Sequence, residues 1–159
     1  MSTGPAHGYL RHPTIHGDTV VFTCEDDLWR VDAAGGRAER LTAGISAYCY
    51  PRLSPDGASI AFVGADEGPT EVYVMAADGG PARRLTFQAA RCVVVGWHPG
   101  TGEILYASMA EQPAGFGYRL FAVPPDGSGP SRPLGFGPAN AVAFGPDGAL
   151  VLGRSIAIE

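Results

Sequence analysis

Residues 51–86 read PRLSPDGASIAFVGADEGPTEVYVMAADGGPARRLT, and this stretch is one complete unit of a repeat that decides the fold. Segment 59–63 (SIAFV) alternates in side-chain direction, and 71–75 (EVYVM) is rich in the β-branched and aromatic residues that strands favour. In 54–57 (SPDG), the proline presets φ for a tight turn and the glycine can adopt a positive φ. The unit therefore predicts antiparallel strands joined by tight turns.

Related units precede and follow this stretch, at 13–42 and 95–134, and a fourth begins at 140–151. Leu41 and Leu85, at equivalent places in two units, are 44 residues apart. A period in the forties filled by short strands is typical of β-propeller blades. We expect an all-β partial β-propeller, with three four-stranded blades plus the start of a fourth. The expected boundaries are a leader at 1–12, blades at 13–48, 49–91 and 92–138, and an incomplete fourth blade at 139–159.

Composition agrees with this fold class and excludes several functions. The 23 Gly and 14 Pro residues would interrupt long helices, while 45% hydrophobic residues suffice for a core. A formal net charge of −5 disfavours nucleic acid as a partner. No apolar run approaches the roughly 20 residues of a membrane helix, and no secretory leader is visible. We expect a cytoplasmic protein that binds neither nucleic acid nor membrane.

The sequence shows no catalytic or metal-binding constellation. No Ser or Cys lies beside a base, and no GxSxG elbow occurs. The histidines lie in the leader or in turns, where we interpret them as solvated or locally hydrogen-bonded, and they lack metal-ligand spacing. They are His7, His12, His16 and His98. We therefore assign no catalytic residue, metal ligand or cofactor to this chain.

Other candidate residues receive structural interpretations. Glu25-Asp26-Asp27 lacks the spacing of a calcium loop, so we expect a solvated hairpin tip. Trp29 and Trp97 lie in strand patterns and are expected to pack between blades. The cysteines are interpreted as small hydrophobic residues, although the cation next to Cys92 could lower the pKa of its thiol. They are Cys24, Cys49 and Cys92.

Arg91 is the candidate binding residue. It lies in the crossover between the outer strand of one blade and the inner strand of the next, at the end of the expected central channel. A guanidinium there can hold a carboxylate through two parallel hydrogen bonds. The alternative is an ordinary surface arginine.

Several segments together resemble the tricorn peptidases, large cytosolic serine peptidases of archaea and actinobacteria. The more specific ones are YLRHPTIHGD at 9–18 and EDDLWRV at 25–31, and AEQP at 110–113, LGFGPAN at 134–140 and VLGR at 151–154 are similar too. The Ser-Pro-Asp-Gly and Arg-Arg-Leu-Thr units alone also resemble Tol-system propellers and those of prolyl-oligopeptidase-like enzymes. The resemblance covers nearly the whole chain, and the composition suits an actinobacterial source.

The resemblance implies that the chain is the first half of the family's N-terminal six-bladed propeller. A second propeller, a PDZ domain and catalytic domains would follow, and the catalytic Ser and His would belong to them. The implied function is a substrate or product channel or filter of an enzyme that degrades oligopeptides downstream of the proteasome. Its partners would be the rest of the peptidase chain, peptide substrates and further copies of the same chain in a homo-oligomer.

The resemblance also bears on Arg91. The family uses a basic pair in this crossover to hold the C-terminal carboxylate of the peptide substrate. Here the loop looks shorter and supplies one arginine, Arg91, followed by Cys92.

The alternative function is a free-standing protein-binding propeller. Propellers close with roughly 4–8 blades, so two or more copies of this chain would assemble to complete one.

Overall fold

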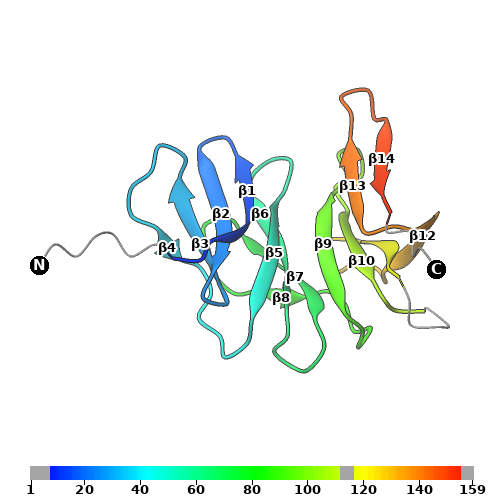
Figure 1. Cartoon of the computed structure of the whole chain (residues 1–159), viewed down its shortest axis with the longest axis horizontal. Helices are drawn as coiled ribbons and strands as arrows, with labels where there is room; N and C mark the ends of the chain where they lie inside the picture. Colours follow the sequence, from blue (N-terminus) through cyan, green and yellow to red (C-terminus); the bar gives the residue numbers. More distant parts are fainter. Residues whose placement is uncertain (1–7, 112–116, 155–159) are drawn as a thin grey trace, which may run out of the picture.

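The computed structural model describes residues 8–111 and 117–154, which fold into antiparallel sheets joined by turns (Figure 1). Three sheets have four strands and one has two, and we call them blades 1 to 4. Blade 1 contains β1 (Arg11–His16), β2 (Thr19–Cys24), β3 (Asp27–Asp32) and β4 (Glu39–Arg40). Blade 2 contains β5 (Tyr48–Leu53), β6 (Ser59–Gly64), β7 (Glu71–Ala76) and β8 (Arg83–Arg84). Blade 3 contains β9 (Cys92–Trp97), β10 (Ile104–Ser108), β11 (Arg119–Val123) and β12 (Arg132–Pro138), and blade 4 contains β13 (Ala141–Phe144) and β14 (Leu150–Gly153).

This architecture confirms the all-β partial propeller with three four-stranded blades and the opening of a fourth. Each four-stranded blade is a meander in which consecutive strands pair. Strand β1 begins at Arg11, so Arg11 and His12 belong to blade 1, although the sequence had suggested a leader there. His7 lies outside the described residues.

The first strands of successive blades are neighbours, because β1 contacts β5, β5 contacts β9 and β9 contacts β13. We call these four the inner strands (Figure 1). Strands β1 and β5 run in the same direction: the His12 ring meets the Tyr50 ring near their N-terminal ends, and further along the backbone N–H of Leu53 donates to the Thr14 hydroxyl. Strand β9 runs the same way as β5, because Trp97 at the C-terminal end of β9 bonds to Arg52 near the C-terminal end of β5. The N-terminal ends of β1, β5 and β9 therefore lie on the same side of the blades.

The core lies between blades rather than within one sheet. Since side chains alternate along a strand, β6 sends Ile60 and Phe62 toward blade 1, and Ala61 and Val63 toward blade 3. All four are completely buried. Blade 2 is therefore apolar on both faces, which explains the unbroken apolar run of its second strand.

Two predicted features have specific outcomes. The turn glycine Gly57 has φ 72°, and its N–H donates to the Ser54 carbonyl at 2.9 Å, as the Ser-Pro-Asp-Gly motif predicted. Trp97 joins blades 3 and 2 by donating from its indole to the Arg52 carbonyl at 2.9 Å. The indole of Trp29 instead donates within blade 1, to the Cys24 carbonyl at 3.1 Å.

Candidate functional site at the ends of the inner strands

Chemically active side chains gather at the N-terminal ends of the inner strands, at the start of β1, β5 and β9. We call them the strand-end cluster: Arg11, His12, Cys49, Tyr50 and Arg91. Charges within this cluster also influence one another, as the pKa of Cys49 shows. Burial raises the pKa of the Cys49 thiol to about 11, and the charges of Arg11 and Arg91 partly oppose that rise. The positive charges of two arginines from different parts of the fold therefore act on one cysteine.

Arg91 lies in the crossover between β8 and β9, where the sequence predicted it, and its side chain is exposed. Its carbonyl accepts a hydrogen bond from the backbone N–H of Met109 at 3.0 Å, which fixes the main chain. No residue in the described part of the chain makes a hydrogen bond or ion pair with the guanidinium. All of its donors are thus available to a carboxylate from outside.

Arg11 of the cluster and the nearby Arg52 already have partners. Arg11 donates to the Asp26 carboxylate at 3.2 Å, and its side chain is 36% exposed. Arg52 donates to the carbonyls of Pro51 at 2.9 Å and Val95 at 3.4 Å. Burial lowers the pKa of Arg52. The sequence offered no signal for Arg11 and Arg52, because only the arrangement of the blades lets the charges of both arginines act on His12.

The cysteines in and beside the cluster are poor nucleophiles. Cys92 is 2% exposed, and burial raises the pKa of its thiol to about 12, overriding any effect of the adjacent cation. Its thiol donates to the Thr70 carbonyl at 3.1 Å. Since the thiolate is the reactive form, Cys49 and Cys92 serve as packing groups, as the sequence interpretation held for them.

The acidic tip predicted in blade 1 needs a correction at Asp27. Glu25 and Asp26 are exposed in the turn, but Asp27 opens β3 and is only 6% exposed. Its carboxylate accepts hydrogen bonds from Thr42 at 2.7 Å and from Arg40. A buried carboxylate needs such partners, so the prediction of a solvated group was wrong for this residue.

The same arrangement recurs in blade 2 around Glu71, which is 2% exposed. The Thr86 hydroxyl donates to the Glu71 carboxylate and accepts from the backbone N–H of Val72 at 2.9 Å. Arg84 donates to the other carboxylate oxygen at 3.3 Å. We call this unit the acid–threonine clasp: an acid at the start of the third strand, the Arg that ends the fourth strand and the Thr two residues after it.

Histidine and metal chemistry are limited. His16 hydrogen-bonds the Pro55 carbonyl at 3.0 Å, and His98 Nδ1 accepts from the N–H groups of Gly100 and Thr101 at 3.1 Å each. The His98 contacts are local, as expected, whereas His16 bonds to a turn of blade 2 that lies 39 residues away in the sequence. Within the described ranges, no three His, Cys, Asp or Glu side chains form a group that could hold a metal ion.

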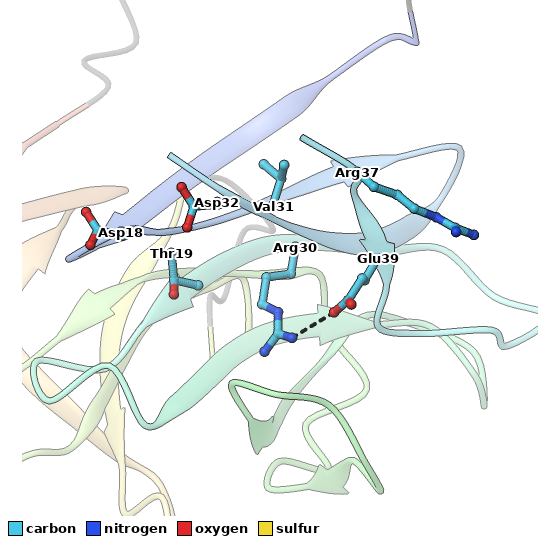
Figure 2. Close-up of a pocket in the computed structure, with 7 residues that line it drawn as sticks. All are labelled: Asp18, Thr19, Arg30, Val31, Asp32, Arg37 and Glu39. Carbon is cyan, nitrogen blue, oxygen red and sulfur yellow. Dashed lines mark hydrogen bonds and ion pairs between the residues drawn. The ribbon is translucent and has the colours of Figure 1, made fainter. Parts of the chain in front are cut away.

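A polar cavity of about 320 Å³ lies in blade 1, away from the strand-end cluster (Figure 2). Arg30 and Glu39 line it and neutralise each other in an ion pair of 2.7 Å. Arg37 also lines it, and its guanidinium points away from that pair in Figure 2. Charges of both signs without a nucleophile give this cavity no evident chemistry.

The family model for the tricorn protease N-terminal beta propeller domain matches residues 7–159. The chain belongs to this tricorn propeller family. It is 45% identical over 93 residues to tricorn protease homolog 1 of Streptomyces coelicolor, covering 58% of this chain and 9% of the relative. It is 39% identical over 132 residues to putative tricorn protease homolog 2 of the same organism, covering 79% of this chain and 11% of the relative.

A solved structure of the tricorn protease has a TM-score of 0.78 and 29% identity, covering 91% of this chain and 15% of that one. The tricorn resemblance is thereby confirmed, and the Streptomyces relatives are consistent with an actinobacterial source. The chain spans about a tenth of the length of the curated relatives named above. Residues 8–111 and 117–154 of the tricorn propeller segment include no helix with the length and the apolar side chains needed to span a bilayer.

Proposed function

We propose that this chain is a non-catalytic propeller segment of a tricorn-like cytosolic serine peptidase. In the intact enzyme it would form part of a channel or filter for oligopeptides released by the proteasome. The family match over residues 7–159 carries this proposal. Hydrolysis would take place in other parts of the peptidase, since the described residues offer no activated nucleophile.

Arg91 is the residue we propose to contact the substrate, by holding the C-terminal carboxylate of a peptide. Its exposed guanidinium has no partner among the described residues, and it lies at the ends of the inner strands, which would line the channel. Arg11 adds positive charge from blade 1, although Asp26 partly neutralises it. A bidentate pair between a guanidinium and a carboxylate would orient the peptide as well as bind it.

Arg91→Gln in the full-length peptidase tests the proposed contact. We expect a higher KM for peptides with a free C-terminus, by roughly 10-fold or more for a charge-assisted pair. Amidated peptides should be little affected, because they lack the carboxylate. Arg37→Gln is the matched control, since it removes an exposed arginine at the far cavity of blade 1. Equal KM changes for both kinds of peptide would remove the carboxylate contact.

The rest of the peptidase is the partner we propose for the open side of the segment. An apolar groove of about 400 Å³ lies between blade 3 and the β13–β14 hairpin, lined by Leu134, Phe136 and Phe144 among others. Further strands of a longer chain would cover these side chains and complete the ring. Peptide substrates and a homo-oligomeric assembly belong to the same proposal.

A further inference from the structure

The crossover that carries Arg91 is held by blade 2 at two places. At the first, the Glu71 carboxylate oxygen Oε1 accepts a hydrogen bond of 2.8 Å from the backbone N–H of Ala89, two residues before Arg91. Ala89 has φ 51°, a left-handed conformation that a non-glycine residue rarely adopts without support. Glu71 supplies that support from a side chain that is 3% exposed.

The second place is Thr70, immediately before Glu71. The backbone N–H of Cys92 donates to the Thr70 hydroxyl at 2.8 Å, and that hydroxyl lies 3.2 Å from the Cys92 carbonyl, to which it donates. Thr70 and Glu71 of blade 2 thus hydrogen-bond the main chain on both sides of Arg91.

Blade 1 shows what the Glu71 side chain adds. There Asp27 makes the same acid–threonine clasp with Thr42 and Arg40. Among residues 8–111 and 117–154, no backbone N–H of the blade 1 crossover donates to Asp27. The glutamate is one methylene longer than the aspartate. Its carboxylate therefore completes the clasp and also reaches Ala89.

We propose that Glu71 is a positioning residue, which holds the crossover in the shape that presents Arg91 to a peptide carboxylate. The inference rests on the proposed function of Arg91 and adds a second residue to it. Glu71 does not touch the substrate and acts only through the backbone of Ala89. The length of its side chain is the decisive property, because the negative charge is already paired with Arg84 and the Thr86 hydroxyl already donates to the carboxylate.

Two substitutions separate reach from charge in the full-length peptidase. Glu71→Asp keeps the charge and the kind of clasp seen in blade 1, but is too short to hold Ala89. Glu71→Gln keeps the length and an acceptor oxygen, but loses the charge. We expect Glu71→Asp to raise the KM for free-carboxylate peptides by roughly 3- to 10-fold, as for one weakened hydrogen bond, with kcat unchanged. Glu71→Gln should stay closer to the parent in this KM, and amidated peptides should show no change.

Combination with Arg91→Gln completes the test. If Glu71 acts through Arg91, Glu71→Asp should have no further effect in the Arg91→Gln background. Asp27→Glu alters the clasp of blade 1 and is the control that should leave the selectivity unchanged. Should Glu71→Asp impair assembly, Thr70→Val is the second test, because it removes the hydrogen bonds between the Thr70 hydroxyl and the Cys92 backbone. Thr70→Ser keeps the hydroxyl and should have the KM of the parent.

Each contrary result has a distinct meaning. An equal rise for free and amidated peptides, or additive effects with Arg91→Gln, would show a general structural role and overturn the inference. A selective effect of Arg91→Gln with Glu71→Asp and Thr70→Val both silent would overturn the positioning role and leave the proposed contact standing. The absence of any selective effect of Arg91→Gln would overturn both.

Discussion

The imidazole of His12 lies against the phenol ring of Tyr50, with the ring centroids 4.0 Å apart and the planes inclined at 33°. The two residues come from adjacent inner strands, and both have a positive φ, 52° and 54°. Each precedes a proline and lies where the pairing with the next strand of its own blade shifts register. Such backbone geometry is costly for non-glycine residues, and we infer that the contact between blades 1 and 2 contributes to offsetting that cost.

His12 should make the stability of this contact depend on pH. Burial lowers the pKa of His12 below its ordinary value, and the charges of Arg11 and Arg52 lower it further. The unfolded chain therefore binds a proton at a higher pH than the folded chain does. The contribution of His12 is full above about pH 6.5, the unfolded value, and falls as the pH decreases toward the folded pKa.

His12→Phe keeps a ring at this position and removes the titration. Urea unfolding of parent and variant between pH 5.5 and 7.5 measures the difference in the free energy of unfolding. We expect the parent to gain relative to the variant as the pH rises, because other titrating groups are common to both. A difference that stays constant over this range would contradict the assignment.

Gly57→Ala should destabilise the protein for two separable reasons. Gly57 has φ 72°, and an added Cβ would lie 2.3 Å from Nδ1 of the His16 ring. Gly148 has φ 80° with no atom within 4 Å of an added Cβ, so Gly148→Ala measures backbone strain alone, about 1–2 kcal/mol. Thermal unfolding should show a larger loss for Gly57→Ala, and His16→Ala should recover the excess. Equal losses at the two glycines would show that the His16 ring moves aside freely.

Thr86→Val should cost about 1–3 kcal/mol in the free energy of unfolding. The substitution removes the hydroxyl that donates to Glu71 and accepts from the Val72 N–H, leaving buried polar groups without a partner. Thr86→Ser keeps the hydroxyl and should retain most of the stability. Denaturant midpoints compare the variants. A serine variant as unstable as the valine variant would show that packing of the methyl group, not the hydrogen bonds, stabilises the clasp.

The cysteines should differ in their reactivity toward a thiol reagent at neutral pH. Burial raises the pKa of Cys92 to about 12 and that of Cys49 to about 11, whereas Cys24 is half-buried. We expect Cys24 to be alkylated first and Cys92 last, as read by peptide mass spectrometry, with all three reacting in denaturant. Alkylation of Cys92 as fast as Cys24 in the folded protein would contradict the buried position.

The features that could be predicted from the sequence are those that depend only on residues close to one another along the chain. Gly57 and its proline specify a turn wherever the chain places them, and alternation along 59–63 specifies a strand. The position of Arg91 between two blades followed from counting repeats. The burial of Asp27 could not be predicted, because three consecutive acids look alike until the strand register decides which one faces the Thr42 hydroxyl.

The sequence by itself determined the blades: a repeat of turns and strands encodes an all-β propeller segment, since each of those signals acts within a few residues. Only the tertiary structure decided what meets at the strand ends. Contacts between His12 and Tyr50, or between Glu71 and the crossover before Arg91, join residues 38 and 18 positions apart. Such contacts depend on how the sheets stack and, for Glu71, on the extra length that one methylene gives its side chain. No local sequence pattern indicates either contact.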